Sequence, residues 1–363
     1  MPLGSNITLI RRAGMLALVL TGLLGQAALG QPPIMSLGGY PVCEASAAIA
    51  IPCPDGKPCI LVADNEIRDA LFRFPIVGGQ ILVDQRTTLP FAAKRRQGKP
   101  VRASSVSISD VEALARLDDR SVLIVGSHSR NKECKSRKNR LRYVAGSIEA
   151  DGIGPGAASV VTSKKKLNCS RLFGKDPDNW SAGIKRLCKA ISQGEKAAQE
   201  ARRETSSCAD AEYLNIEGAV SALVREGERE TWFGLRAPLV GQNAVLARLK
   251  SNPYHLQFDR TLFVDLGGRG IRELTVAGTQ IWGIAGPTTD KGAHSFQLFR
   301  FPIDALSGAR VIKPKVVEDP LPPSSEGLVV TGNFALVLID GSRLRGSQRC
   351  RKESKYVSYR VTR

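Results

Sequence analysis

The apolar and polar positions of this chain follow a three-part unit that recurs five times. The unit opens with an acidic residue followed by small and apolar residues, at Glu44, Glu112, Glu217, Glu273 and Glu326. After a turn, the second part is an apolar segment that ends in polar or turn residues and begins at Ile60, Ser121, Thr231, Ile281 and Phe334. The third part sets one Arg before an apolar residue, at Arg73, Arg142, Arg248, Arg300 and Arg360. Short apolar runs between turns indicate β-strands, so each unit predicts three strands.

The repeat predicts an all-β fold, a β-propeller with five blades. Propeller blades are commonly four-stranded, and fourth strands are expected from Gly79, Arg260 and Ala309. The fifth unit reaches Arg363 without one, and the segment from Ile34 to Pro41 could supply it and close the ring. The alternative is that any antiparallel sheet yields such hairpins. Recurrence of the acid and the Arg in register favours the propeller.

One segment, residues 163–210, breaks the repeat and is interpreted as a helical insertion docked on the ring. Trp180, Ile184, Leu187 and Ile191 are spaced as one face of an amphipathic helix. We expect this face to serve packing rather than to form a groove for a partner.

The first thirty residues are typical of a signal peptide. Arg11 and Arg12 precede an apolar segment of about a dozen residues, which is short for a membrane span, and Ala28-Leu29-Gly30 suits cleavage before Gln31. We therefore expect residues 31–363 to form a single propeller domain in a periplasmic or secreted protein. No later stretch of the sequence is long and apolar enough to span a bilayer.

Without residues 1–30 the chain has 50 basic and 34 acidic residues and a net charge of +16. Its eight Cys, an even number in an exported chain, predict disulfides, with a zinc site as the alternative. Cys53 and Cys59 flank one turn and are expected to bond to each other. Two of Cys169, Cys188 and Cys208 should pair within the insertion, and the third should bond Cys43, Cys134 or Cys350. We favour Cys134 for that bond, which leaves Cys43 to bond Cys350.

Strand direction divides these features between two faces of the ring. Strands in a meander alternate in direction, so the acids that open each unit, the ends of the second strands, the loops at 130–140 and 343–355 and the insertion share a top face. The turn at 52–58 lies on the other face. The expected central site is Glu112, His128, Glu217, Arg236, Glu273, Glu326 and Asp340, with Asp64 beside it and Glu44 as its weakest member. The alternative is that each acid caps its own blade.

The rim of this face is basic. Arg130, Lys132, Arg137 and Lys138 are candidate anion-binding residues, so an anionic small molecule or a polyanion of the cell envelope is the expected partner. Nucleic acid is disfavoured, because neither basic loop carries an aromatic residue on which bases could stack.

No catalytic motif identifies a reaction. The sequence holds no G-x-S-x-G elbow, H-E-x-x-H, P-loop or EF-hand loop. Ser127 and His128 are adjacent on a strand and point to opposite faces, so they cannot simply pair as nucleophile and base. His128 as a general base with a distant carboxylate is one interpretation, and a structural His is the other.

The segments DVEALARL with VGSHSRNK, NIEGAV with GLRAPL, and VDLGGRGIREL with IAGPT resemble a bacterial family known as domain of unknown function 3616. The resemblance implies a propeller-like fold and no established reaction. A looser similarity, in the Glu-Gly strand starts, is to propellers labelled esterase-like phytases. It implies phosphoester hydrolysis with a metal such as calcium.

The sequence supports two functional hypotheses. The first is binding of an anionic ligand on the top face, with no metal. The second is metal-assisted phosphoester hydrolysis, in which Glu112, Glu217, Glu273, Glu326 and Asp340 hold a hard cation that activates water. The sequence leaves open whether the protein is an enzyme.

Overall fold

The structure is a computed structural model. It describes residues 1, 32–91, 95–96, 99–100, 107–131, 133–155, 161–162, 168–204, 208, 211–250, 256–308, 311–344 and 346–362. The chain separates into two units, Met1–Gln31 and Pro32–Arg363. The expected signal peptide lies outside the described residues. No helix among the described residues has the length and apolar character needed to cross a membrane.

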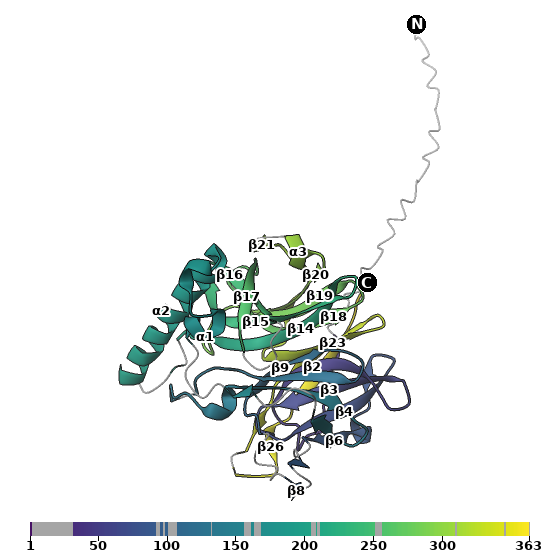
Figure 1. The fold of residues 1–363 in the computed structure, drawn as a ribbon. Helices are drawn as coiled ribbons and strands as arrows, with labels where there is room; N and C mark the ends of the chain where they lie inside the picture. The colour runs from purple at the N-terminus through teal and green to yellow at the C-terminus, as the bar shows by residue number, and fades with distance from the viewer. Residues whose placement is uncertain are drawn as a thin grey trace. The chain divides into compact units, whose positions relative to one another are not determined.

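Pro32–Arg363 is a five-bladed β-propeller with a helical insertion, as the repeat predicts (Figure 1). Each blade is a meander whose innermost strand lies beside the innermost strands of both neighbouring blades, so the five sheets form a closed cycle. The innermost strands are β2 (Ala45–Pro52), β9 (Val111–Arg116), β14 (Asn215–Arg225), β18 (Gly270–Ala277) and β23 (Ser325–Thr331).

The remaining strands complete the blades in chain order. Blade 1 adds β3 (Pro58–Asp64), β4 (Ala70–Val77), β5 (Gln80–Ile81) and β6 (Thr87–Pro90), and blade 2 adds β10 (Ser121–Gly126), β11 (Arg142–Ile148), β12 (Ile153–Pro155) and β13 (Val161–Thr162). Blade 3 adds β15 (Glu228–Val240), β16 (Asn243–Leu249), β17 (Phe258–Val264) and β21 (Val311–Ile312), and blade 4 adds β19 (Gln280–Gly286), β20 (Phe296–Pro302) and β22 (Lys315–Leu321). Blade 5 adds β24 (Phe334–Ile339), β27 (Lys355–Arg360) and β1 (Ile34–Ser36). Two short hairpins, β7 (Arg95–Arg96) with β8 (Lys99–Pro100) and β25 (Ser342–Arg343) with β26 (Cys350–Lys352), and the helix α3 (Ala305–Gly308) lie outside the blades.

The ring closes through the N-terminal part of this unit. Strand β1 pairs antiparallel with β27, the C-terminal strand of blade 5, which confirms the predicted closure. The pairing continues beyond the strand, because the Leu37 N–H donates to the Ser354 carbonyl at 2.9 Å and Ser36 Oγ donates to Glu353 Oε2 at 2.8 Å. One blade is therefore built from both ends of the unit, which covers an edge of β27 that would otherwise be open.

The predicted fourth strand that starts at Ala309 is divided between two blades. Val311–Ile312 forms β21, which pairs in parallel with β17 of blade 3, and only Lys315–Leu321 forms the fourth strand of blade 4. The sequence pattern predicts one strand over both apolar segments, because it does not indicate that the chain crosses from one sheet to the next between them.

Five hydrophobic clusters among the described residues fill the spaces between neighbouring blades. For example, Trp232 and Leu246 of blade 3 pack with Leu274 and Phe299 of blade 4. Each blade is thus covered on both faces, so its inner strands are buried along most of their length. The sequences of strands that are covered on both faces are continuous apolar segments, whereas half-exposed strands alternate apolar and polar residues.

The Arg of the repeat lies on the third strand of every blade and supports the sheets. Arg73 Nη2 donates to the Ala150 carbonyl of blade 2 at 2.8 Å. The guanidinium of Arg300 lies 5.0 Å from the ring centre of Trp282, within the range of a cation–π contact. Arg248 pairs with Glu230 and with Asp259. These contacts give the repeated Arg a structural role.

The insertion contains α1 (Cys169–Phe173), a 3₁₀ turn (Pro177–Asn179) and α2 (Ala182–Glu204), and α2 packs on β15 and β17 of blade 3 (Figure 1). Leu187 and Ile191 are buried in the cluster between blades 2 and 3, so the apolar face serves packing as expected. The spacing predicts Trp180 on the same helix face, but Trp180 precedes the helix. The Ser181 side chain accepts the Ile184 N–H and the Ser181 carbonyl accepts the Lys185 N–H, so Ser181 caps a helix that starts after Trp180.

The eight cysteines form four disulfides: Cys43–Cys350, Cys53–Cys59, Cys134–Cys208 and Cys169–Cys188. The first two are the favoured pairings, and the last two confirm one bond within the insertion and one from it to Cys134, with Cys208 as the residue that the sequence left open. The zinc alternative is wrong, because all eight cysteines are bonded in pairs. Cys53–Cys59 is confined to its own hairpin, while the other bonds join elements assigned to the top face. Disulfides are typical of oxidising compartments, and the compartment itself stays a prediction.

The Cys53–Cys59 bond should contribute less to stability than the disulfides that close longer loops. It closes a loop with a sequence separation of only 6, and the entropic gain of a disulfide grows with loop length. Replacing both residues by Ser should lower the free energy of unfolding by about 2 kcal/mol, measured by chemical denaturation. A loss comparable to that of opening the Cys43–Cys350 bond would contradict this expectation.

Candidate functional site

A cavity of about 370 Å³ lies where the five innermost strands begin. Its lining comes from all five blades and from the segment that follows the insertion. The carboxyl groups are Glu44, Glu66, Asp110, Glu112, Glu217, Asp290, Glu326 and Asp340, and the guanidinium groups are Arg130, Arg140, Arg236 and Arg272. Asn65, Ser129, Tyr213 and Asn215 add neutral polar groups. We call this cavity the axial pocket.

Five of the seven central residues expected from the sequence line the axial pocket: Glu112, Glu217, Arg236, Glu326 and Asp340. His128 and Glu273 do not line it. Asp64 lies just behind the lining, and Glu44, the weakest expected member, is part of it.

A β-bulge near the start of every innermost strand explains how four side chains, one each from blades 2 to 5, reach the pocket. In each blade one residue has no partner on the second strand: Ser46, Glu112, Glu217, Arg272 and Glu326. A bulge inserts an extra residue and re-aims its side chain. These five positions are therefore equivalent, and the acid of the repeat occupies the equivalent position in only three blades.

Glu273 illustrates the consequence, because it follows the bulge rather than occupying it. It pairs with Ile284, as Gly218 of blade 3 pairs with Gly234. Its side chain is fully buried and accepts the N–H of Ala48 at 3.0 Å and that of Leu274 at 2.9 Å. By accepting the Leu274 N–H, Glu273 caps its own blade, the alternative that the sequence left open, and by accepting the Ala48 N–H it also ties blade 4 to blade 1. Arg272, which occupies the bulge, lines the pocket instead of Glu273.

The surroundings of His128 favour the structural interpretation. Its backbone has a φ of +57°, and its Nδ1 lies 2.6 Å from the Gly126 carbonyl, so Nδ1–H donates to that oxygen. Burial lowers the pKa of His128 to about 4, and the hydrogen bond only partly opposes this. The imidazole therefore stays neutral, and the general-base interpretation finds no support in its position.

One side of the axial pocket is a network of ion pairs. Arg272 Nε lies 2.8 Å from Glu217 Oε2, and its Nη2 pairs with Glu326. Arg236 pairs with Glu217 Oε1 at 3.0 Å and with Asp290 Oδ1 at 2.8 Å. Guanidinium groups here neutralise buried carboxylates, which burial would otherwise strongly destabilise.

Asn215 of blade 3 and the Arg140–Asp110 ion pair of blade 2 extend this network. Asn215 Nδ2 donates to Glu217 Oε1 at 2.7 Å, while its Oδ1 is buried and has no partner among the described residues. In blade 2, Arg140 pairs with Asp110 at 2.7 Å. Asp110 and Asn215 precede the repeat acids of their blades by two positions. Residues two apart on a strand point to the same face, so this spacing could have identified both as pocket residues from the sequence.

The other side of the pocket carries carboxyl groups without ion pairs. Among the described residues, no Lys or Arg forms an ion pair with Glu44, Glu66, Glu112 or Asp340. Burial raises the pKa of Glu112 well above its usual value, and Asp110 and Glu217 raise it further. Burial, followed by the charges of Glu326 and Glu44, raises the pKa of Asp340 to about 9. Asp340 is therefore protonated at neutral pH in the empty pocket, and the surroundings of Glu112 favour its protonated form.

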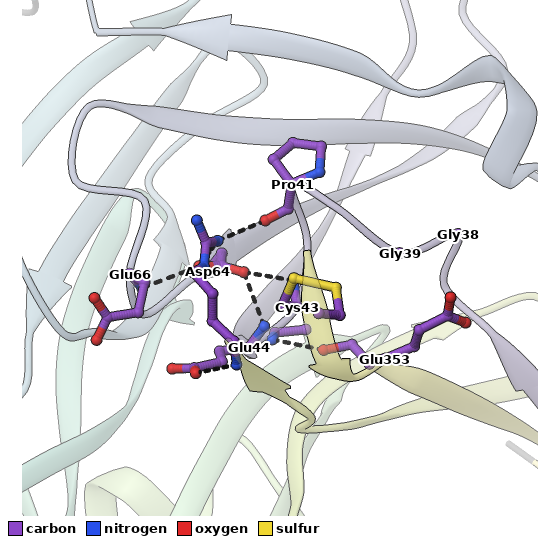
Figure 2. The surroundings of a disulfide bond; sticks show 12 residues. Gly38, Gly39, Pro41, Cys43, Glu44, Asp64, Glu66 and Glu353 are labelled. Carbon is purple, nitrogen blue, oxygen red and sulfur yellow. Dashed lines mark hydrogen bonds and ion pairs between the residues drawn. A yellow bond between two sulfur atoms is a disulfide. The ribbon is translucent and has the colours of Figure 1, made fainter. Parts of the chain in front are cut away.

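Figure 2 shows how the fold holds one edge of this carboxyl side. Asp64 Oδ2 accepts the N–H groups of Cys43 and Glu44, each at 2.8 Å, beside the Cys43–Cys350 disulfide. Arg343 Nη2 pairs with Asp64 Oδ1 at 3.1 Å and donates to the Pro41 carbonyl. The side chains of Glu44 and Glu66 extend to the same side, away from the disulfide. Asp64 and Arg343 thus position the strand start, and Glu44 reaches the pocket.

The expected anion-binding rim is only partly assembled. Arg130 pairs with Glu195 of α2 and donates to the Cys134 carbonyl, so its charge is already neutralised. Arg137 and Lys138 are exposed, and Arg137 is 3.9 Å from Glu133. Lys132 lies outside the described residues. Of the three rim residues that the structure describes, only Arg137 and Lys138 are open to a partner.

The donor set does not suit a metal ion. Within the described ranges, no three His, Cys, Asp or Glu side chains form a group that could hold one. Glu217 and Glu326 share Arg272, and Glu273 is turned away, so three of the five carboxylates expected to hold a cation have other partners.

Comparison with known proteins identifies no activity. A family model described as "Protein of unknown function (DUF3616)" matches residues 214–318, in agreement with the resemblance of the sequence. Among solved structures, a GH43_1 enzyme from Xanthomonas citri has a TM-score of 0.44 and 10% identity over 90% of each chain. An alpha-L-arabinofuranosidase from Lactobacillus brevis has a TM-score of 0.42 and 8% identity over 88% of this chain and 92% of its own. No curated protein matches. The propeller assignment rests on the five sheets themselves.

Proposed function

We propose that this propeller is a binding protein whose axial pocket holds a small polar ligand rich in hydrogen-bond donors. The observation that carries the proposal is the excess of acceptors in the lining: eight carboxyl groups face four guanidinium groups, and the guanidinium groups are already paired. Asn215 Oδ1 and Asp340 Oδ1 are buried without partners among the described residues. Buried polar atoms are normally hydrogen-bonded, so a ligand that donates to them would complete the site.

The pocket is large enough for such a ligand. A volume of about 370 Å³ holds on the order of a dozen water-sized groups and lies within the usual range for small-molecule sites. The anionic ligand predicted from the basic rim finds more support on the outer surface, where Arg137 and Lys138 are exposed. A polyanion of the cell envelope would contact them there rather than enter a pocket rich in carboxyl groups.

The proposal is tested by thermal-shift screening with neutral polyols, amines and anions. We expect a donor-rich compound to raise the melting temperature of the wild type and of Glu228→Gln, an exposed control outside the pocket. The shift should disappear in Glu112→Gln and in Asn215→Leu. If every class fails to shift the wild type, or if the shift survives in both pocket variants, the pocket is not the binding site.

Metal-assisted hydrolysis of a phosphoester, the second hypothesis from the sequence, has less support because the carboxylates that would hold the cation are paired with Arg272 or turned away. We expect millimolar calcium to leave the melting temperature unchanged and generic phosphoesters to remain intact. A calcium-dependent rise in the melting temperature that is lost in Glu217→Gln would favour the hydrolase instead. The similarity to esterase-like phytases stays a prediction.

A further inference from the structure

We infer that the ligand of the axial pocket carries a protonated amine, which lies against the carboxyl side formed by Glu44, Glu66, Glu112 and Asp340. This inference rests on the proposed function, because it names the chemical class of the ligand at the same site.

The inference begins with the uneven distribution of charge around the pocket. Every guanidinium group of the described lining is committed to a carboxylate: Arg130 to Glu195, Arg140 to Asp110, Arg236 to Glu217 and Asp290, and Arg272 to Glu217 and Glu326. The carboxyl groups left without an ion pair there come from blades 5, 1 and 2, which are consecutive around the ring. The carboxyl groups on one side of the pocket therefore have no cationic partner among the described residues, whereas those on the other side do.

A second, independent observation points to a ligand at this site. Asn215 is 9% exposed, lines the pocket and leaves Oδ1 without a partner in the described part of the chain, while Nδ2 is used by Glu217. The amide oxygen can only accept hydrogen bonds. An occupant that donates would satisfy it together with the carboxyl oxygens.

An ammonium group fits these acceptors better than a metal ion does. Calcium needs six to eight oxygens at about 2.3–2.6 Å, and no group of this kind exists among the described residues. An ammonium has three N–H donors and accepts oxygens at ordinary hydrogen-bond distances. It therefore suits carboxyl groups that face one cavity without converging on a single point.

Proton release should accompany binding. The charged groups that face Asp340 are Glu326, Glu44 and Asp64, all acidic, and the backbone N–H of Gly341 opposes them only in part. Glu112 faces Asp110, Glu217 and Glu326, opposed by Arg272. These surroundings keep Asp340 protonated in the empty pocket and favour the protonated form of Glu112. An arriving ammonium favours their ionised forms, so each carboxyl that ionises releases one proton.

Affinity should therefore depend on pH. Below the raised pKa of the empty pocket, a ligand that displaces one proton binds more tightly as pH rises, by about tenfold per pH unit. The effect should end near pH 9, where Asp340 ionises without the ligand.

Three four-carbon probes with different end groups test the inference: 1,4-diaminobutane, 1,4-butanediol and succinate. We expect calorimetry to show binding of the diamine, at least tenfold weaker binding of the diol and no binding of succinate. The diamine remains charged up to about pH 8.5, and its affinity should rise about tenfold per unit between about pH 6.5 and 8.5. Titrations in two buffers of different ionisation enthalpy should count about one proton released.

The variants separate this inference from the proposed function. Asp340→Asn and Glu66→Gln should each weaken diamine binding at least tenfold, and Asp340→Asn should flatten the pH dependence, while Glu228→Gln leaves both unchanged. If the diol binds as tightly as the diamine or more tightly, and Glu112→Gln abolishes this binding, the ligand does not require an amine. The axial pocket then remains the binding site. Failure of the diamine to bind overturns the inference. Diamine binding that is unaffected by any pocket variant overturns both proposals.

Discussion

Replacing Cys43 and Cys350 together by Ser should lower the free energy of unfolding by about 5 kcal/mol, which we expect to be the largest effect of any disulfide removal. The two residues are 307 positions apart, so their bond constrains almost the entire unfolded propeller. The entropic cost that a disulfide imposes on the unfolded chain increases with the length of the loop it closes.

The native ring should survive this change, because strand β1 remains hydrogen-bonded to β27. The expected signature is therefore a fold that is retained but unfolds at a lower denaturant concentration, monitored by circular dichroism. Cys53→Ser with Cys59→Ser is the matched control, since it also removes one disulfide but opens a loop of separation 6. Equal losses in the two double variants would show that ring closure does not depend on the long-range bond.

The same variant should weaken ligand binding. Asp64 holds the N–H groups of Cys43 and Glu44, and the disulfide holds Cys43 against β26 (Figure 2). Without the bond, the segment that presents Glu44 to the pocket is held mainly by Asp64 and Arg343. We expect a loss of about threefold to tenfold in affinity for the best ligand, on the order of 1 kcal/mol.

The fold could be predicted from the sequence because its signals are local and repeated. Each blade needs an apolar second strand, as in ILVA from Ile60, and a third strand that carries one Arg, and both repeat in order. Strand direction separated Cys53 and Cys59 from the other six cysteines, because residues assigned to opposite faces of a ring cannot bond, but it left open which two of Cys169, Cys188 and Cys208 pair. The fourth strand expected from Gly79 is limited to Gln80–Ile81, and Thr87–Pro90 pairs with β4 after it. The misplaced strand at Val311–Ile312 depends on a parallel pairing between blades that no local pattern encodes.

The site was harder to predict because a bulge shifts the register by one residue. The sequence aligns Glu273 with Glu217 and Glu326, whereas the structure aligns Arg272 with them. A shift of one residue moves a side chain to the other face of a strand. The acid of the repeat therefore has two roles: at the bulge it lines the pocket, and one position later it caps backbone N–H groups.

The raised pKa of Asp340 has a consequence for stability that can be measured without a ligand. Its pKa in the folded protein is about 9, whereas an unfolded Asp titrates near 3.8. A raised pKa favours the folded state fully below the unfolded value, and this contribution is lost as pH rises toward 9. Asp340→Asn should therefore gain stability relative to the wild type as pH increases from about 5 to 9. A difference that does not vary with pH would show that Asp340 is ionised in the empty pocket.

Arg272→Ala should cost about 3–5 kcal/mol of stability, because it leaves two buried carboxylates, Glu217 and Glu326, without their shared cation. Arg272 is 5% exposed and occupies the bulge position of blade 4, so water cannot easily replace it. Arg116→Ala, which removes a surface pair with Asp119, is the matched control and should cost at most about 1 kcal/mol.

The origin of the Arg272→Ala loss can be resolved by pH and by a second substitution. Burial raises the pKa of Glu326 and the charge of Arg272 opposes this, so without Arg272 the Glu326 carboxyl is harder to ionise and the deficit should shrink as pH falls and Glu326 becomes protonated. Adding Glu326→Gln to Arg272→Ala should restore part of the lost stability, since it removes one unpaired buried charge. If the double variant is less stable than Arg272→Ala by the full cost of Glu326→Gln alone, Arg272 acts through packing on Phe296, whose ring centre lies 5.4 Å from its guanidinium, rather than through charge.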